Sequence, residues 1–291
     1  MDRILRATSK NNEVRAFVAE TRDLVNKGTS MHHTTPVASA ALGRLLTGGA
    51  MMGVMLKGNN DLITLNIKGD GPLGGVLVTT NAKGQVKGYV QNPLVDIPTK
   101  TNGKLDVSGS IGKGTMTVIR DLGLKEPYVG QIELVSGEIA DDLTYYFASS
   151  EQVPSVVALG VLVDTDYSIK QSGGFIIQLL PGASEETIKQ IESNIHDLPS
   201  VTAMFENGFK GEDILGKILM DLEPKVHEVI IPEYKCNCSK SRVEKALISV
   251  GEKDIQEMID DGETIELNCH FCDEKYHYTV DELKELLIKS R

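Results

Sequence analysis

The sequence contains no tryptophan, and aromatic residues make up only 5% of its 291 positions. Together with 28 glycines, this composition favours a fold with many turns and β-strands over an all-helical bundle. Hydrophobic residues account for 41%, an ordinary share for a globular protein, which excludes disorder throughout the chain. The length suffices for one large domain or two modest ones.

Basic residues are scarce relative to acidic ones, since 30 Lys and Arg face 41 Asp and Glu, for a net charge of −11. Nucleic acid is therefore not expected as a partner, because phosphate binding needs a surplus of Lys and Arg on at least one face. The balance changes along the chain. Residues 1–179 carry 17 basic and 17 acidic side chains, residues 180–231 carry 4 and 10, and residues 232–291 carry 9 and 14. The acidic surplus thus belongs to the last part of the sequence.

The sequence also lacks signals for secretion or membrane insertion. No apolar stretch of signal-peptide length follows the charged residues at the N-terminus, so a cytoplasmic location with reduced thiols is expected. Residues 36–56 are mostly apolar, but Arg44 lies near their middle, where a charge costs about 2.5–3.5 kcal/mol on insertion scales. We expect these residues to form a buried helix, and no contact with a membrane.

Periodicity predicts a change of structure near Leu180. Strands are expected at residues 2–8, 13–21, 62–68, 75–80, 85–90, 115–120, 129–135, 156–163 and 174–180, with helices at 37–56 and 139–150. After Pro181-Gly182 the pattern becomes helical, with three short amphipathic segments before Pro224 and a final helix at 279–290. Helices this short are marginal unless they pack against something.

These patterns predict an α+β fold in three parts. A β-rich core domain with flanking helices spans residues 1–180, a helical linker spans 181–231, and a small C-terminal domain spans 232–291. Sixty residues with few large hydrophobic side chains bury too little surface to be comfortably stable alone. Something else must stabilise this last part.

The four cysteines supply a candidate, because all of them lie there: Cys236, Cys238, Cys269 and Cys272. Two close pairs separated by 30 residues can meet as a tetrahedron of thiolates, a soft ligand set that selects zinc in a reducing compartment. One zinc ion is therefore the predicted cofactor. Its binding energy, about 10–16 kcal/mol in zinc-finger peptides, could supply most of the missing folding energy.

The chemistry of the cysteines leaves two roles open. The metal could simply stabilise a zinc ribbon. Alternatively, it could be a redox switch, because Cys236 and Cys238 are close enough for a strained local disulfide once the metal leaves, and exposed thiolates are open to oxidants. His270 is interpreted as a neighbour of the site or a surface residue, and His277 and the pair His32-His33 as surface or local hydrogen-bonding residues.

Other motifs do not build an enzyme. Gly69-Asp-Gly-Pro-Leu-Gly74 matches a dinucleotide-binding pattern, but β-rich sequence on both sides and Pro72 indicate a hairpin connection. In Gly112-Lys-Gly-Thr115, Gly114 occupies the position where a phosphate loop has the Ser or Thr that binds magnesium, and the upstream Gly of that loop is absent. Asp141-Asp142 is expected to cap a helix. No catalytic residues are predicted.

The cysteine pattern at the C-terminal end of a chain of this length resembles the heat shock protein 33 family of redox-regulated holdase chaperones. Gly69–Gly74 and the segment Tyr146-Phe-Ala-Ser-Ser-Glu-Gln-Val-Pro-Ser155 are similar to N-terminal segments of that family. The order of β-rich domain, helical linker and zinc domain extends the resemblance over essentially the whole chain.

The resemblance implies an ATP-independent mechanism. The reduced, zinc-bound protein would be inactive, and oxidative stress would form the disulfides Cys236–Cys238 and Cys269–Cys272 and release zinc. The linker and zinc domain would then unfold, and the exposed surface would bind unfolding client proteins, with the chain acting as a homodimer, especially when oxidised. From the residues alone, four cysteines permit three pairings. The alternative function is an adaptor whose zinc ribbon binds a protein or nucleic acid in the reduced state.

Overall fold

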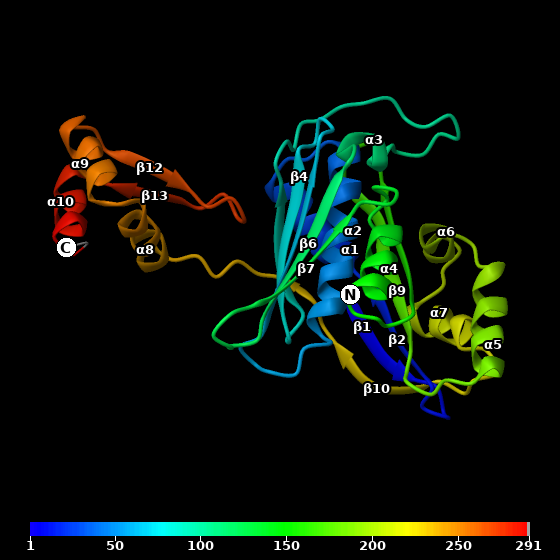
Figure 1. The fold of residues 1–291 in the computed structure, drawn as a ribbon. Helices are drawn as coiled ribbons and strands as arrows, with labels where there is room; N and C mark the ends of the chain where they lie inside the picture. Colours follow the sequence, from blue (N-terminus) through cyan, green and yellow to red (C-terminus); the bar gives the residue numbers. More distant parts are fainter. Residues whose placement is uncertain (290–291) are drawn as a thin grey trace. The chain divides into compact units, whose positions relative to one another are not determined.

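The computed structural model describes residues 1–289 and consists of two compact units (Figure 1). The first unit runs from Met1 to Lys235, and the second begins at Cys236. The boundary falls directly before the first cysteine, so all four cysteines belong to the second unit.

The first unit contains two sheets. In spatial order, the five-stranded sheet consists of β10 (Lys225–Ile230), β1 (Arg3–Thr8), β2 (Val14–Glu20), β9 (Ile169–Leu179) and β8 (Ser155–Val163), all antiparallel. The six-stranded sheet consists of β11 (Glu233–Tyr234), β5 (Gln85–Val90), β4 (Gly75–Asn81), β3 (Leu62–Gly69), β6 (Gly114–Asp121) and β7 (Tyr128–Glu133). Its strands are antiparallel except for β11, which runs parallel to β5. Alternate side chains of β3, such as Ile63 and Leu65, point into the core, as expected from the period of two.

The helix α2 (Pro36–Gly53) lies between the two sheets and is buried along almost its whole length (Figure 1). This confirms the predicted buried helix. Its single charge, Arg44, reaches the carboxylate of Glu138 at 2.6 Å, so the apolar surroundings contain a paired ion instead of an isolated one. Within the described residues no helix is both long and apolar enough to span a membrane.

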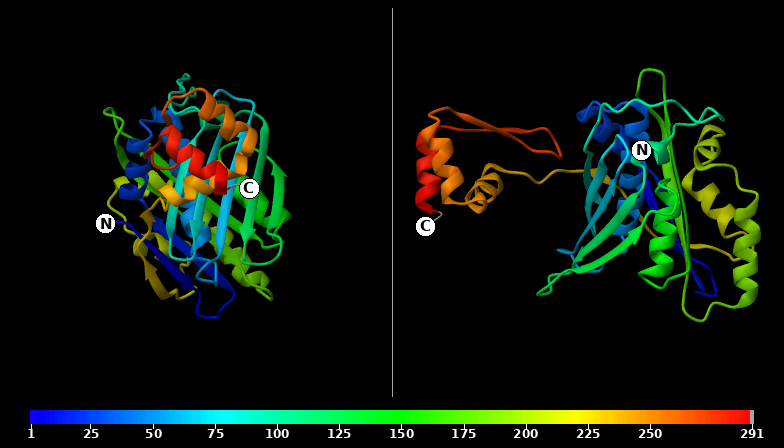
Figure 2. Two further views of the ribbon diagram at one scale, coloured as in Figure 1. Left: turned by 90° about the vertical axis from the view of Figure 1, so that its left-hand side faces the viewer. Right: turned by 45° about the horizontal axis from the view of Figure 1, so that its top comes forward.

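The opposite face of the five-stranded sheet is covered by three short helices, α5 (Glu185–His196), α6 (Val201–Glu206) and α7 (Gly211–Ile218) (Figure 2). Each begins with a capping interaction; the Ser184 hydroxyl, for instance, accepts a hydrogen bond from the Thr187 amide. The helices approach the strands closely. A Cβ atom on Gly173 would lie 2.5 Å from the Phe205 ring, so this ring can pack where it does only because residue 173 is glycine. These helices thus obtain from the sheet the packing that their length requires.

The predicted strands and long helices of the first unit are confirmed, with ends shifted by a few residues; the strand expected at 174–180 begins already at Ile169. Four elements were not predicted: α1 (Arg22–Met31), α3 (Val107–Ile111), β10 and β11. The helix expected at 139–150 is α4 (Ala140–Ser149). Helical structure after Leu180 ends at Ile218, and the residues after Pro224 return to the five-stranded sheet as β10.

The second unit is small. It contains α8 (Lys240–Val250), α9 (Glu252–Asp260), the hairpin of β12 (Ile265–Asn268) and β13 (Lys275–Tyr278), and α10 (Val280–Lys289). Of these, the sequence predicted only α10. Six of its described apolar residues are buried, namely Leu247, Ile255, Tyr278, Leu283, Leu286 and Leu287, and four of them, Leu247, Tyr278, Leu283 and Leu286, form its main cluster.

Candidate metal centre

The four cysteine sulfurs of the second unit lie together, all within 4.8 Å of one another. The Sγ atoms of Cys236 and Cys269 are 3.7 Å apart, and those of Cys238 and Cys272 are 3.3 Å apart. These distances are too long for disulfide bonds. Among the described residues this is the one group of three or more Cys, His, Asp and Glu side chains that could hold a metal ion. The structure thus brings together all four residues that the sequence predicted as ligands.

The turn of the β12–β13 hairpin presents one pair of sulfurs. The amide of Cys269 donates to the carbonyl of Glu274, and the amides of Cys272 and Asp273 donate back to the carbonyl of Cys269. Asp273 has a φ of 55°, in the left-handed region that such a tight turn needs. Two residues between the cysteines therefore suffice to reverse the chain and aim both sulfurs to the same side.

The other pair of sulfurs comes just before α8. Ser239 caps this helix by accepting a hydrogen bond from the Arg242 amide, so Cys238 is held directly ahead of a helix start. The hydroxyl of Tyr278, from β13, donates to the carbonyl of Lys240 and ties the hairpin to this helix. The two sulfur pairs are thus positioned by elements that contact each other.

Tyr276 also contacts the site, and the sequence did not reveal it. Its hydroxyl donates a hydrogen bond to Cys238 Sγ at 3.1 Å. Partial burial alone raises the pKa of Cys238, but the hydrogen bonds from Tyr276 and the neighbouring thiols outweigh it and lower that pKa. Burial raises the pKa values of Cys236 and Cys272. An available signal was the period-two pattern of β13, which places Tyr276 two residues before the buried Tyr278.

The arrangement fits a tetrahedral metal ion. Metal–sulfur bonds of about 2.3 Å in a regular tetrahedron place the sulfurs about 3.8 Å apart. The observed separations of 3.3 and 3.7 Å, and the outer limit of 4.8 Å, lie around this value. Four deprotonated sulfurs near one another repel each other, and a divalent cation at their centre would remove that repulsion.

The other residues considered from the sequence lie away from this centre or beside it. His270 lies in the Cys269–Cys272 turn but does not belong to the group of ligand atoms. The exposed His277 is 3.6 Å from Glu266. His32 hydrogen-bonds the carbonyl of Gly88 at 3.0 Å, and the His33 amide donates to Ser30, both within the first unit.

The two motifs of the first unit have structural roles. Gly69–Gly74 forms the β3–β4 hairpin connection, as predicted, with a hydrogen bond from the Gly69 amide to the Gly74 carbonyl. Asp142 accepts hydrogen bonds from the amides of Val135, Ser136 and Ile139 at the start of α4, which confirms its capping role. Neither motif contributes to a catalytic arrangement.

Comparisons with known proteins agree on one family. The family model described as "Hsp33 protein" matches residues 2–279. The chain is 52% identical over 289 residues to the 33 kDa chaperonin of Lachnoclostridium phytofermentans, covering 99% of both chains, and 52% identical over 287 residues to that of Clostridium tetani, covering 98% of both.

A solved structure agrees in fold as well. The crystal structure of the 33 kDa chaperonin (heat shock protein 33 homologue) from Thermotoga maritima matches with a TM-score of 0.91 and 38% identity, over 99% of this chain and 98% of that one. Because these matches span nearly the whole sequence and include the unit that brings the four cysteines together, the chain belongs to the heat shock protein 33 family of chaperones.

Proposed function

We propose that this protein is a redox-regulated, ATP-independent holdase that binds unfolding proteins under oxidative stress and catalyses no reaction. The observation that carries the proposal is the placement of four metal-competent cysteines in a unit whose described residues include only six buried apolar side chains. A unit built in this way is stable with its metal and unstable without it. Oxidation of the sulfurs, which removes the metal, would therefore unfold this unit.

Zinc is the proposed ion. Four thiolates are soft ligands, tetrahedral geometry suits a d¹⁰ ion, and a closed set of four sulfurs leaves no open position for catalysis. Cys236, Cys238, Cys269 and Cys272 would each contribute one bond. The expected setting is the cytoplasm, where thiols stay reduced until an oxidant reaches them.

The proposed disulfides join neighbours in the sequence, Cys236 with Cys238 and Cys269 with Cys272. Once the metal has left and the unit loosens, sulfurs separated by one or two residues stay close to each other, whereas sulfurs separated by more than 30 residues pay a larger loop-closure entropy. Each disulfide forms as two thiols lose two electrons and two protons to an oxidant such as peroxide. Once they are joined in disulfides, the sulfurs can no longer bind zinc as thiolates.

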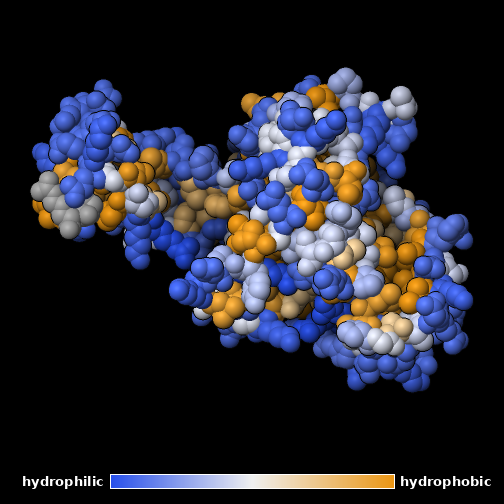
Figure 3. Space-filling view, viewed as in Figure 1, coloured by the Kyte–Doolittle hydropathy of each residue, from blue (hydrophilic) through white to orange (hydrophobic). Residues whose placement is uncertain are grey.

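The activated protein needs an apolar surface, and the linker covers one. In the first unit, the linker helices face a group of apolar side chains from the five-stranded sheet: Leu5, Ala7, Val14, Ala16, Val18, Phe175 and Ile177. If the linker, residues 181–231, unfolds, both this sheet face and the apolar sides of α5–α7 become available to unfolding clients. Figure 3 shows apolar residues reaching the surface over the strands between α4 and α6–α7, where partly buried side chains of β8 lie.

Two further properties belong to the proposal. The acidic surplus lies in residues 180–291, so the parts that open carry like charges that keep an unfolded state soluble. We also propose that the protein acts as a homodimer, especially when oxidised, as its family resemblance implies. Clients are proteins rather than nucleic acids, in keeping with the acidic balance.

Light scattering of an aggregating client tests the function. The reduced, metal-loaded protein is expected to leave aggregation unchanged, and the peroxide-treated protein to suppress it without ATP. A variant with all four cysteines replaced by serine serves as a control that cannot respond to peroxide. Suppression by the reduced protein that is lost on oxidation would instead support the adaptor function.

A further inference from the structure

Tyr234 is buried in a part of the chain where most side chains are exposed, with Pro232 as the other buried residue between Ile231 and Cys236. The Tyr234 side chain is 2% exposed, whereas Val229 is 55% and Ile231 57% exposed. It is the last buried residue of the first unit and precedes Cys236 by two positions. A large aromatic side chain that is fully buried at such a place fixes the chain there.

The pocket that receives Tyr234 is specific for its ring and hydroxyl. The hydroxyl donates to the carbonyl of Gly88 at 2.8 Å and lies 3.3 Å from His32 Nε2. The ring lies against Gly28 of α1, where an added Cβ atom would be 2.9 Å from the ring atom Cε2. Because Gly28 has no side chain, the ring reaches its place between α1 and β5.

Backbone contacts reinforce the ring. The amides of Glu233 and Lys235 donate to the carbonyls of Gly84 and Val86, which adds β11 to the six-stranded sheet. The ammonium group of Lys27 donates to the Tyr234 carbonyl at 3.1 Å. All these partners belong to the first unit, so the contacts do not depend on the metal centre.

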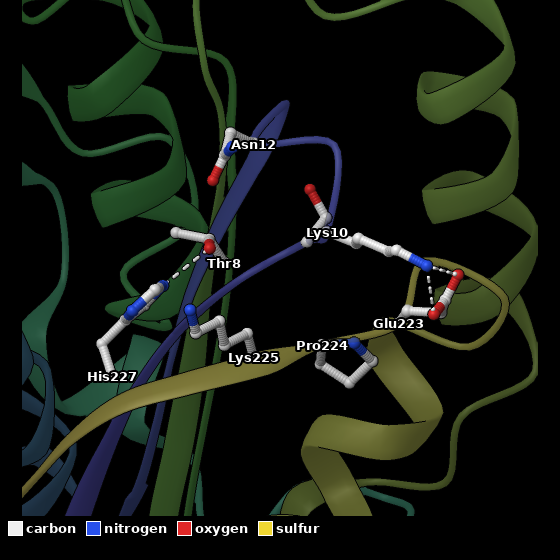
Figure 4. A pocket seen from close by; sticks show the side chains of 8 residues that line it. Thr8, Lys10, Asn12, Glu223, Pro224, Lys225 and His227 are labelled. Carbon is white, nitrogen blue, oxygen red and sulfur yellow. Dashed lines mark hydrogen bonds and ion pairs between the residues drawn. The ribbon is translucent and has the colours of Figure 1, made fainter.

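The strand β10, which ends the linker, pairs with β1, and this pairing is interrupted beside His227. Its side chains are exposed except that of Ile230, which is half-buried and packs against the core of the first unit. The start of β10 is fixed by a hydrogen bond between Thr8 and His227 at 2.8 Å and by the ion pair of Lys10 with Glu223 (Figure 4). Exposed contacts of this kind contribute little, so beside the β1–β10 pairing and Ile230 the buried Tyr234 ring is the main side-chain attachment of this segment.

We propose that Tyr234, seated among Gly28, His32 and Gly88, is a latch that holds the C-terminal end of the linker on the first unit. Loss of the metal unfolds the chain from Cys236 onward, and the linker is released only when the Tyr234 ring leaves its pocket. The latch thus separates unfolding of the second unit from exposure of the sheet face under α5–α7. Its consequence for client binding rests on the proposed function, but its existence does not.

Hydrogen exchange of the reduced, metal-loaded protein tests the latch directly. Tyr234→Ala is expected to raise the exchange rates of the amides in residues 225–235 by about tenfold or more, because truncation of a buried aromatic ring removes several kcal/mol of packing. Amides of β3 and β4 and the metal content are expected to stay as in the wild type. Tyr145→Ala, which removes a half-exposed tyrosine from α4, is the matched control and should change none of these rates.

Gly28→Ala provides an independent test that leaves Tyr234 in place. In a helix, alanine is more favourable than glycine by about 1 kcal/mol, so a purely local effect would stabilise α1. The latch predicts destabilisation of another segment, seen as faster amide exchange at residues 233–235, because the new methyl group on residue 28 occupies space that the Tyr234 ring needs. Tyr234→Phe, which keeps the ring, should have a smaller effect than Tyr234→Ala.

Unchanged exchange at residues 225–235 in both Tyr234→Ala and Gly28→Ala would overturn the latch. A general rise in exchange rates that includes β3 and β4 would also overturn it, since Tyr234 would then be an ordinary core residue.

The proposed function is tested separately by the client assay with oxidised wild type. If oxidised wild type binds no clients while Tyr234→Ala still frees residues 225–235, the function fails and the latch stands. If oxidised wild type binds clients and Tyr234→Ala frees nothing, the latch alone fails.

Discussion

The two units of the molecule reach stability by different routes. In the first, α2 lies between two sheets and the core extends through nearly every element, with residues such as Leu42, Leu45 and Met51 completely buried. In the second, the main apolar cluster has four buried residues, and four sulfurs converge beside it. Burial suffices for the first unit, whereas we propose that the second depends on a metal held by its sulfurs. One chain would thus contain a unit that folds by burial alone and a unit that folds only with its metal.

The largest expected effect is loss of the metal. Cys272→Ser removes one of four ligands, and because metal binding contributes about 10–16 kcal/mol in comparable sites, the second unit should unfold. Residues 1–180 of the first unit should stay folded. Heteronuclear NMR spectra would show this as collapsed resonances for residues 236–289 beside dispersed ones for residues 1–180. A second unit that stays folded without metal would break the comparison between the two units.

Truncation of a buried leucine in each unit sharpens the comparison. Leu215→Ala in α7 and Leu283→Ala in α10 remove side chains that are 3% and 0% exposed, and each should cost about 2–5 kcal/mol of unfolding free energy. Only Leu283→Ala should also weaken metal binding, because folding and binding are linked in the second unit. Thermal unfolding combined with chelator competition measures both. Equal metal affinity in the two variants would contradict the linkage.

A pH effect is expected in the first unit. Burial opposes ionisation of Glu138, but its hydrogen bonds with Lys100 and Arg44 outweigh burial and lower its pKa from 4.5 to about 2. A carboxylate whose pKa is depressed on folding stabilises the protein above its unfolded pKa, so this contribution should be lost as the pH falls from about 4.5 to 2. The loss should be about 3.5 kcal/mol, since the pKa falls from 4.5 to about 2 and one pKa unit corresponds to about 1.4 kcal/mol.

Glu138→Gln should flatten that pH dependence in urea unfolding of the first unit. Glu186→Gln, a substitution in the exposed first turn of α5, is the control and should leave the curve as in the wild type. If Glu138→Gln loses as much unfolding free energy as the wild type between pH 4.5 and 2, other carboxylates cause that loss.

The smallest expected effect concerns Tyr276. Tyr276→Phe removes the hydrogen bond to Cys238 Sγ and keeps the ring, so metal affinity should fall by roughly tenfold at most, as one hydrogen bond contributes about 0.5–1.5 kcal/mol. Competition with a chromophoric chelator measures it. Tyr167→Phe, on an exposed tyrosine of the first unit, should change nothing. Equal affinities in both variants would remove Tyr276 from the metal centre.

The sequence predicted those features that depend on short-range patterns. The grouping of the four cysteines was predicted because their spacing is itself the signal, and the buried helix α2 because an apolar run with a proline start is distinctive. The strand β10 was missed because a six-residue strand with exposed side chains has no apolar face to reveal it. Its signal was the β-branched pair Val229-Ile230 after Pro224.

The latch and the Tyr276 contact were missed for another reason. Tyr234 contacts Gly28 and Gly88, and Tyr276 contacts Cys238, so each pair is far apart in the sequence. No local pattern encodes such a contact. The division into core domain, linker and zinc domain remains a prediction. The boundary between the two compact units falls between Lys235 and Cys236 in the sequence.

The central claim is that metal loss, unfolding and client binding are coupled. A peroxide titration that records zinc release, helix content and suppression of client aggregation on the same samples tests it most directly. The account predicts that zinc release and loss of helix rise together and that suppression appears only in samples that have lost both. Oxidised protein that has released its zinc, lost helix and suppresses no aggregation would contradict it.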